Sequence, residues 1–438
     1  KYDKEADLDD FLNDSLAQWE QVYGSSPTEV NAELRFKGVI RRAFERTGLQ
    51  VVVLVDEYDK PFLSIIDNKP LHDAYRNTLK AFFSVLKSMD DYIRFVFITG
   101  VSKFSHVSIF SDLNNLNDIS MDPRYVDICG ISERELHDYF DSSIRELADA
   151  NGMTYEEACE KLRKQYDGYH FRESSIGVYN PFSLLNTFDS LVFNDYWFVT
   201  GTPTFLVKLL QSKNYKLEDL EGKKVMSDVL STTDTATSNP IPVLYQSGYL
   251  TIKGYDRNMR IYTLGFPNEE VERGFLNFLL PYYTPIGNDD KAGFLSDFVM
   301  AVNEGRPEDF LLLMQTMLAG RDYRIAGDAE KYFQNTFYLI FQLLGFNVAV
   351  EQATSQGRMD ITIQTKDYIY IIELKLDKTA EEALRQIKDN HYARPFQTDG
   401  RKLYLIGVNF SSETRTVEKW MVEEQSVQHG EYGKGAER

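Results

Sequence analysis

The chain has 438 residues, 43% of them hydrophobic and 26% charged, which is enough for two or three globular domains. Its formal net charge of −19 argues against a protein that coats nucleic acid non-specifically, because such proteins are usually basic. Two cysteines and six scattered histidines indicate neither a disulfide framework nor a zinc site, and they fit the reducing conditions of the cytoplasm. No stretch approaches ~18 consecutive apolar residues, so we expect a cytoplasmic protein without a membrane span.

Residues 1–130 form the first predicted domain, in which helical and strand patterns alternate. The run "VVVLV" at 51–55 is apolar, β-branched and of strand length. Residues 71–89 have a helical pattern, and "IRFVFI" at 93–98 predicts a second buried strand. Strand, helix, strand is typical of α/β folds, and the lack of alternation in the first strand predicts a parallel sheet covered on both faces.

Polar side chains that are typical of a nucleotide-hydrolysing site follow the two predicted strands. Asp56 and Glu57 come directly after the first strand in a Walker B arrangement, where Asp holds Mg²⁺ and Glu polarises the attacking water. Thr99 follows the second strand and is a candidate sensor of the γ-phosphate. Acids also end parallel strands without any such role, so that alternative stays open. The sequence contains no G-x-x-x-x-G-K-[ST] phosphate cradle.

Residues 131–325 form a predominantly helical middle region. Two capping boxes, Ser132 with Glu135 and Thr154 with Glu157, mark helix starts. The polar stretch 227–242 predicts a loop. Beyond it, we expect a hairpin across "YDRNM" and then a helix with Pro267 at its start, which together suggest a winged-helix-like unit near 240–285.

Residues 326–425 form the third predicted domain, again of α/β type. The elements that we expect are, in chain order, a helix over 328–345, strands over 347–354, 359–365 and 368–376, a helix over 379–396, a strand over 402–410 and a closing helix over 416–424.

An acid and a base share one face of the strand "YIYIIELKL" in this third domain. Alternation places Glu373 and Lys375 on the face of Ile369 and Ile371, and a hairpin brings Asp360 of the preceding strand close to them. Two adjacent carboxylates repel unless a cation intervenes, and Mg²⁺ or Mn²⁺ suits carboxylate ligands. A metal held by Asp360 and Glu373, with Lys375 beside it, fits phosphodiester hydrolysis. A simple salt bridge, with Asp360 as a turn residue, is the open alternative.

An Asp followed by Glu-x-Lys on the next strand resembles the PD-(D/E)XK nuclease superfamily, which implies a restriction-endonuclease-like α/β fold. The resemblance adds two site residues, Glu330 on the helix before the sheet and Gln386 on the helix after Glu-x-Lys. The catalytic set that it implies is therefore Glu330, Asp360, Glu373, Lys375 and Gln386.

Stretches along nearly the whole chain resemble one family of bacterial proteins, which have an AAA-ATPase-like N-terminal domain and a PD-(D/E)XK C-terminal domain. Matching stretches include "VVVLVDEYDKPF", "YDGYHF", "LYQSGYLTIKGYD" and "YIIELKLDKTAEEALRQI". In that family the P-loop lies upstream of the Walker B strand, so we expect that a segment containing it is missing here. We therefore expect the N-terminal domain to be a partial P-loop (AAA-like) domain, which binds ATP when that segment is present.

The function that these features predict is nucleotide-regulated, metal-dependent hydrolysis of nucleic-acid phosphodiester bonds. We expect nucleic acid, with DNA favoured over RNA, and a nucleotide as partners; a homo-oligomer stays open. Residues 328–438 carry 14 Lys+Arg against 17 Asp+Glu, so most of the negative charge lies in the first three quarters of the chain. Two alternatives remain: a binding or scaffolding module without turnover, and a signalling ATPase with a nuclease-like sensor domain.

Overall fold

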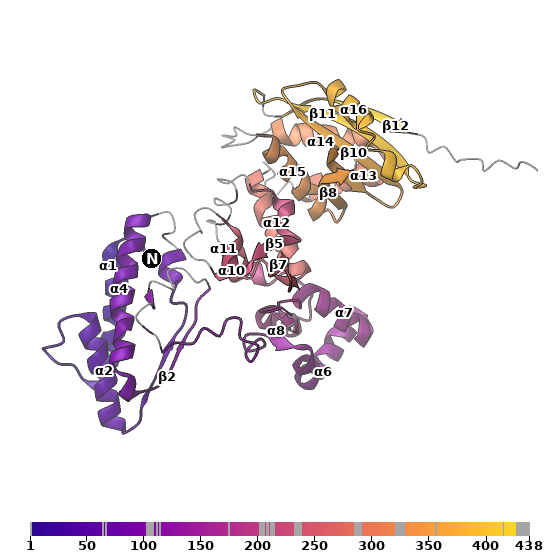
Figure 1. Ribbon diagram of the computed structural model, residues 1–438. Helices are drawn as coiled ribbons and strands as arrows, with labels where there is room; N and C mark the ends of the chain where they lie inside the picture. Colours follow the sequence, from indigo (N-terminus) through magenta and orange to yellow (C-terminus); the bar gives the residue numbers. More distant parts are fainter. Residues whose placement is uncertain are drawn as a thin grey trace, which may run out of the picture. The chain divides into compact units, whose positions relative to one another are not determined.

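The computed structural model divides into two compact units (Figure 1). The N-terminal unit comprises Lys1–Leu184 and Lys223–Pro267, and the C-terminal unit comprises Leu185–Gly222 and Asn268–Arg438. Within the described residues, no helix is both long and apolar enough to cross a membrane. The structure describes residues 2–63, 65, 68–101, 109–110, 113, 115–173, 176–200, 206, 210, 215–231, 239–283, 291–319, 329–354, 357–414 and 416–425.

The first part of the N-terminal unit packs helices beside a small parallel sheet. Stacked rings of Phe36 and Phe82, with centroids 4.6 Å apart, join the second helix to the fourth. The expected strand–helix–strand order and the parallel pairing are confirmed. The elements are α1 (Glu5–Tyr23), α2 (Ala32–Thr47), β1 (Val51–Val55), α3 (Lys60–Leu63), α4 (Lys69–Ser88), η1 (Asp90–Tyr92) and β2 (Ile93–Ile98).

The expectation that both faces of this sheet are covered is wrong for the described part of the chain. Burial alternates along β1, and Leu54 is 70% exposed. Val52 and Phe95 are also exposed, and the Phe95 and Phe97 rings stack on the same face. Apolar residues in a strand indicate that burial would be favourable. Whether a layer of helices covers the strand depends on other segments of the chain.

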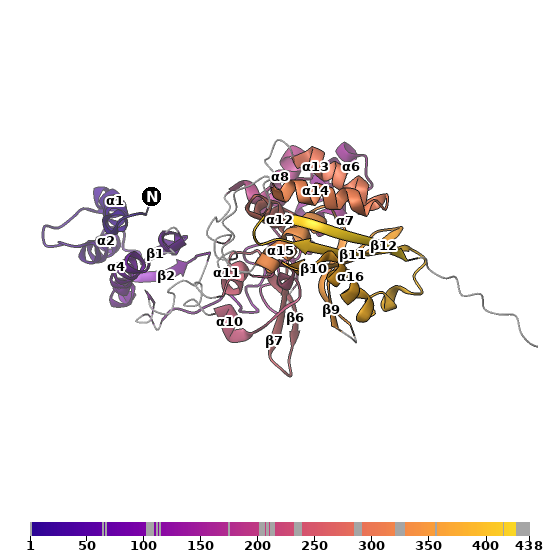
Figure 2. The ribbon, with the colours of Figure 1, turned by 90° about the horizontal axis from the view of Figure 1, so that it is seen from above.

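The remainder of the N-terminal unit contains helices and two antiparallel sheets. Ser132 and Thr154 cap their helices through the predicted capping boxes. The hairpin across 255–259 is confirmed, and Figure 2 shows its two strands, labelled β6 and β7. The second of these strands also pairs with β5, which gives the order β5-β7-β6. The winged-helix-like organisation of this region stays a prediction. The elements are β3 (Ile131–Ser132), α6 (Glu133–Asn151), α7 (Tyr155–Tyr166), β4 (Val178–Tyr179), β5 (Lys223–Met226), α10 (Ser227–Ser231), α11 (Ile241–Gln246), β6 (Thr251–Asp256) and β7 (Ile261–Gly265), with α8 (Pro181–Ser190) at the boundary between the units.

The C-terminal unit is built on a five-stranded sheet of order β12-β11-β10-β9-β8. β10 and β11 are parallel, and the other neighbouring pairs are antiparallel. The four strands predicted for this region are all confirmed. The elements are η2 (Trp197–Thr200), η3 (Leu217–Leu220), α12 (Glu269–Tyr283), α13 (Lys291–Asn303), α14 (Pro307–Ala319), α15 (Ala329–Leu343), β8 (Asn347–Thr354), β9 (Gly357–Gln364), β10 (Tyr368–Leu376), α16 (Ala380–Asp389), η4 (Arg394–Phe396), β11 (Lys402–Phe410) and β12 (Val417–Gln425).

Helices cover both faces of this sheet. On one face, Ile369 and Ile371 of β10 pack with Leu384 and Ile387 of α16. On the other face, the Tyr370 ring meets Phe310 of α14 edge to face, and its hydroxyl donates to the Val302 carbonyl of α13 at 2.6 Å. The alternating side chains of β10 therefore enter two separate cores, and Glu373 and Lys375 belong to the face that α16 covers.

The predicted closing helix over 416–424 is wrong, because these residues form the edge strand β12. Val417, Trp420 and Met421 have helical spacing, which favours a helix in the sequence alone. In the structure, the backbone of β12 pairs with β11 along eight residues. Without this strand, the buried strand β11 would leave backbone donors and acceptors unpaired, so tertiary pairing outweighs the local pattern.

Candidate functional site

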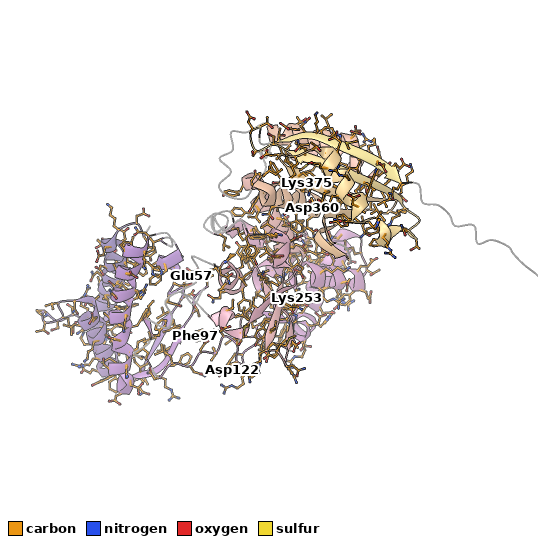
Figure 3. All side chains as sticks on the ribbon, turned by 45° about the horizontal axis from the view of Figure 1, so that its top comes forward. Glu57, Phe97, Asp122, Lys253, Asp360 and Lys375 are labelled. Atoms are coloured by element: carbon orange, nitrogen blue, oxygen red, sulfur yellow. The ribbon has the colours of Figure 1, made fainter. Side chains whose placement is uncertain are left out.

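Asp360 and Glu373 lie together where β9 and β10 stop pairing. The last paired residues are Ile361 and Ile372. Asp360 and Glu373 are the next residues of the two strands, and they share one face of the sheet with each other. Asp360 Oδ2 accepts a hydrogen bond from the Leu374 backbone N–H at 2.8 Å. This bond fixes the Asp360 carboxylate across the neighbouring strand, in the region where Figure 3 labels Asp360 and Lys375.

The Glu373 side chain is almost entirely buried, with 1% of its surface exposed. Its Oε1 accepts a hydrogen bond from Lys375 Nζ at 2.9 Å. Its Oε2 is buried and has no hydrogen-bond partner within the described residues. Burial, followed by the charge of Asp360, raises the pKa of Glu373 to about 7, and the adjacent ammonium of Lys375 opposes this rise.

This arrangement fits a divalent cation. Among the described residues, no donor reaches the buried Oε2 of Glu373, and a second carboxylate, that of Asp360, raises the pKa of Glu373. Mg²⁺ and Mn²⁺ favour such oxygen ligands and complete their coordination with water. Among the described residues, no group of three or more His, Cys, Asp or Glu side chains is placed to hold a metal. The described part of this site therefore consists of two carboxylates and an ammonium.

The other two predicted residues of this site lie on helices of the same unit. Gln386 is half-buried on α16, which begins at the Thr379 capping box. Glu330 falls in α15, the helix before the sheet, but its side chain lies outside the described residues. The structure therefore brings Asp360, Glu373 and Lys375 together, while the participation of Glu330 and Gln386 stays a prediction.

Gly407 of β11 is a positioning residue that the sequence reasoning missed. It is the register partner of Glu373 on the parallel neighbouring strand. A Cβ built on Gly407 would lie 2.3 Å from the Ala380 carbonyl oxygen and 2.6 Å from the Leu384 nitrogen. Only glycine lets the first turns of α16 approach the sheet this closely. The available signal was a glycine inside an otherwise apolar strand.

The predicted nucleotide-site residues also meet at one edge of their sheet. Thr99 Oγ1 donates to Asp56 Oδ1 at 2.5 Å and accepts from the Glu57 backbone N–H at 3.4 Å. Glu57 has a φ of +52°, and its carboxylate pairs with Lys60 at 2.7 Å. Parallel β1 and β2 explain this meeting, because their carboxyl ends lie at the same edge.

Asp59 supports this edge and was also missed. It is fully buried, and its Oδ1 accepts from the Val101 backbone N–H at 3.0 Å. The bond joins the turn after β1 to the turn after β2. A carboxylate three positions past a Walker-B-like Asp was the only signal in the sequence, and it is weak without the fold.

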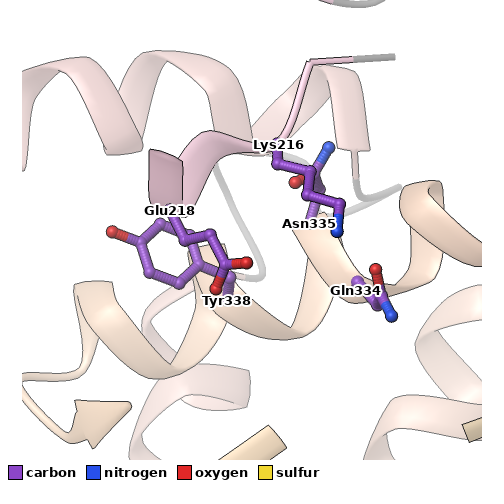
Figure 4. A pocket seen from close by; sticks show the side chains of 5 residues that line it. All are labelled: Lys216, Glu218, Gln334, Asn335 and Tyr338. Atoms are coloured by element: carbon purple, nitrogen blue, oxygen red, sulfur yellow. The ribbon is translucent and has the colours of Figure 1, made fainter. Parts of the chain in front are cut away.

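A small surface hollow in the C-terminal unit lies between η3 and α15 (Figure 4). Asn335 Oδ1 accepts from the Leu217 backbone N–H at 3.1 Å, and its Nδ2 donates to the Tyr215 carbonyl at 2.9 Å. Because both ends of this amide hold the η3 segment, we interpret the hollow as a structural junction. Its lining residues are Lys216, Glu218, Gln334, Asn335 and Tyr338.

Comparison with known proteins gives two family matches and one relative. Residues 1–110 match the model of a predicted AAA-ATPase family, and residues 328–420 match a model of the PD-(D/E)XK nuclease superfamily. The chain is 35% identical over 425 residues to a protein of Azotobacter chroococcum mcd 1 named "Uncharacterized protein in vnfD 5'region", which covers 95% of this chain and 80% of that protein. No solved structure matches the chain. These matches confirm the predicted combination of an AAA-ATPase-like N-terminal domain with a PD-(D/E)XK C-terminal domain.

Proposed function

The chain belongs to the family of AAA-ATPase-like proteins with a C-terminal PD-(D/E)XK nuclease-superfamily domain, and from this premise we propose that it is a nucleotide-regulated, metal-dependent nuclease. Its substrate would be a phosphodiester bond of DNA or RNA, with DNA favoured. The observation that carries the proposal is the buried Oε2 of Glu373, which has no hydrogen-bond partner among the described residues and lies beside Asp360 and Lys375.

Asp360 and Glu373 would hold the metal ion in this proposal. When bound, Mg²⁺ or Mn²⁺ would supply a more acidic water and stabilise the charge that develops on the phosphate. The hydrogen bond from the Leu374 N–H keeps Asp360 in place before the ion arrives. Burial of Glu373 excludes bulk water from one side of the site, which strengthens electrostatic interactions there.

Lys375 would place a positive charge at the reacting phosphate. Its side chain is mostly buried, and its ammonium already lies in the site through its bond to Glu373. An ammonium in a poorly solvated site stabilises developing negative charge and orients the attacking water. Gln386 and Glu330 are proposed to complete the site from α16 and α15.

The N-terminal domain is proposed to regulate this reaction by binding ATP. Asp56 would hold Mg²⁺ and Glu57 would polarise water, with Thr99 sensing the γ-phosphate next to both. This role also requires a phosphate-binding loop, and the sequence contains no G-x-x-x-x-G-K-[ST] motif. The helical region 131–325 would then transmit the nucleotide state to the nuclease-like domain. ATP hydrolysis that is unchanged in a Glu57→Gln variant would refute the Walker B role.

A metal-dependent cleavage assay tests the nuclease. Single-stranded and double-stranded DNA and RNA are incubated with Mn²⁺, Mg²⁺ or EDTA, and Lys375→Ala serves as the site variant. We expect cleavage that requires the metal and falls by at least about a hundredfold in the variant. Equal cleavage by Lys375→Ala would refute the site assignment, because a contaminating nuclease does not respond to this substitution.

A second candidate function is a binding or scaffolding module without turnover. The Glu373–Lys375 ion pair favours it, since an acid and a base already satisfy each other without a metal. Calorimetric titration with Mn²⁺ separates the two functions. Heat that disappears in Asp360→Asn and Glu373→Gln supports the nuclease, whereas no binding in the unmodified chain supports the scaffold.

A further inference from the structure

The turn between β6 and β7 presents two arginines on the surface of an acidic protein. Arg257 and Arg260 are exposed in the tip of this hairpin, whose strands are labelled in Figure 2. Within the described residues, neither guanidinium makes an ion pair or a side-chain hydrogen bond. The chain has 67 Asp+Glu against 48 Lys+Arg, so acidic partners are plentiful in the protein but absent at this described tip.

The three-stranded sheet that carries this turn is locally basic. Val225 of β5 pairs with Tyr262 of β7, and both are buried. Alternation therefore places the exposed Lys224 on the opposite, open face of the sheet. Lys224 likewise has no acidic partner among the residues that the structure describes. The three strands and the turn 257–260 contain one acid, Asp256, against the bases Lys223, Lys224, Lys253, Arg257 and Arg260.

The single acid of this sheet serves to fold the turn. Asp256 Oδ1 accepts hydrogen bonds from the backbone N–H groups of Asn258 and Met259 at 2.9 and 3.0 Å. Side-chain-to-backbone bonds of this kind fix a turn. At the base of the turn, the rings of Tyr255 and Tyr262 pack with their centroids 4.5 Å apart. The turn is therefore formed before any partner binds, which lowers the entropic cost of binding.

The backbone of Arg260 gives an independent reason to assign a role to its side chain. Its φ is +55°, in the left-handed region that glycine adopts at the lowest cost. An arginine at this position strains the turn, and among the described residues its exposed guanidinium makes no bond that offsets the strain. A strained residue whose side chain extends into solvent is better explained by an external ligand than by the fold.

We propose that the β6–β7 turn binds the phosphate backbone of nucleic acid through Arg257 and Arg260, and that Lys224 extends this contact. Guanidinium groups form paired hydrogen bonds with phosphate oxygens. Contacts with phosphates carry no base information, so binding should not depend on sequence. The acidic remainder of the chain repels a polyanion, and this basic surface would supply the attraction. The choice of partner rests on the proposed function, but the residues lie outside the nuclease-like domain.

Fluorescence anisotropy in EDTA tests the inference on the full chain without any cleavage. Labelled single-stranded DNA, duplex DNA and RNA are titrated at several salt concentrations. We expect Arg257→Gln/Arg260→Gly to weaken binding at least about tenfold at low salt, and to reduce the dependence of log Kd on log salt by about one for each arginine. Because Arg260→Gly also relieves the backbone, affinity should fall without a loss of stability in urea, which separates a binding role from a structural one.

Two further variants sharpen the test. Arg94→Gln/Arg134→Gln removes the same charge from two other exposed arginines of the N-terminal unit, and it should change the affinity by less than about twofold. Asp256→Asn keeps the oxygen that accepts from the backbone of the turn but removes its negative charge, so it should tighten binding about two- to threefold. If the double variant of the turn does not fold, Arg257→Gln alone should weaken binding about threefold.

The outcomes separate this inference from the proposed function. Equal affinity of Arg257→Gln/Arg260→Gly and the unmodified chain overturns the inference, as does an equal loss in the control pair or no binding of any of these nucleic acids. Poly-glutamate that competes as well as DNA at equal charge concentration would indicate an acidic protein as the partner and would also overturn it. The proposed function is decided separately, by metal-dependent cleavage and its loss in Lys375→Ala.

Discussion

Lys375 Nζ lies 2.9 Å from Glu373 Oε1, and this ion pair has one partner fully buried and the other mostly buried. The pair leaves Glu373 Oε2 without a donor in the described structure, beside a second carboxylate on β9. A salt bridge that served stability alone would be expected to satisfy both carboxylate oxygens. We therefore propose that this oxygen serves to bind a divalent cation rather than to stabilise the sheet.

The stability of the metal-free protein should depend on pH through Glu373. Its pKa of about 7 in the folded chain is above the value of about 4.3 in an unfolded chain. The folded state therefore binds more protons between these values, and stability is lost as pH rises from about 4.3 to 7. Glu373→Gln removes this loss. From pH 5 to pH 8, the free energy of unfolding of this variant should therefore rise by on the order of 1–3 kcal/mol relative to that of the unmodified chain.

Urea denaturation in EDTA at pH 5 and pH 8 measures this change. Asp399→Asn is a control for general charge effects in the same unit, because the pKa of Asp399 is lowered to about 2 by its bonds to Arg401. If Glu373→Gln and the unmodified chain differ in stability by the same amount at both pH values, the raised pKa of Glu373 is contradicted.

Metal affinity should fall as the solution becomes acidic. A carboxylate must lose its proton to bind a cation, and Glu373 gains its proton as pH falls below about 7. Mn²⁺ affinity should weaken by up to about tenfold for each unit of pH below 7, and level off above 7. Calorimetric titrations at pH 5.5, 6.5 and 7.5 provide the test. An affinity that stays constant across this range would exclude Glu373 as a ligand with a raised pKa.

Gly407→Ala should destabilise the C-terminal unit. The added methyl group meets backbone atoms of α16 at 2.3 and 2.6 Å, so the helix must move away from the sheet. We expect a loss of about 1–3 kcal/mol in the free energy of unfolding, as for other overpacked sites. Gly400→Ala is the matched control, because its Cβ has no atom within 4 Å. Equal stability of the two variants would show that α16 does not depend on Gly407.

Thr99→Val should weaken the edge that joins β1 and β2. It removes the hydroxyl that donates to Asp56 and accepts from the Glu57 N–H, while it preserves the branched shape. A loss of roughly 0.5–1.5 kcal/mol is expected from the missing hydrogen bonds. Thr99→Ser keeps the hydroxyl and should lose less. Thermal unfolding of both variants is the measurement, and a smaller loss in Thr99→Val than in Thr99→Ser would contradict the role of the hydroxyl.

Much of the C-terminal unit was predictable because its strands carry their own signals. The run "YIYIIELKL" begins with aromatic and β-branched residues at 368–372, and its alternation correctly placed Glu373 and Lys375 on one face. The turn before Tyr368 fixed the antiparallel register that brings Asp360 to the same end. Local propensity, pattern and turn chemistry agreed there, so short-range reasoning was sufficient.

The features that were not predictable depend on contacts between segments far apart in the sequence. β12 is a strand because β11 needs a partner, which the composition of 417–425 does not reveal. The exposure of Leu54 depends on which segments cover β1, and the apolar composition of the strand does not predict this. The role of Gly407 depends on Glu373, its register partner on β10, which is distant in the sequence. Register across parallel strands cannot be read from one strand alone.

Mn²⁺-dependent cleavage of a phosphodiester substrate by the unmodified chain and by Lys375→Ala decides whether this chain is a nuclease that uses the proposed site. We expect cleavage that EDTA abolishes and that falls at least about a hundredfold in Lys375→Ala, with both proteins equally stable in urea. Cleavage at the same rate in both proteins, or none in either despite Mn²⁺ binding at Glu373, would contradict it.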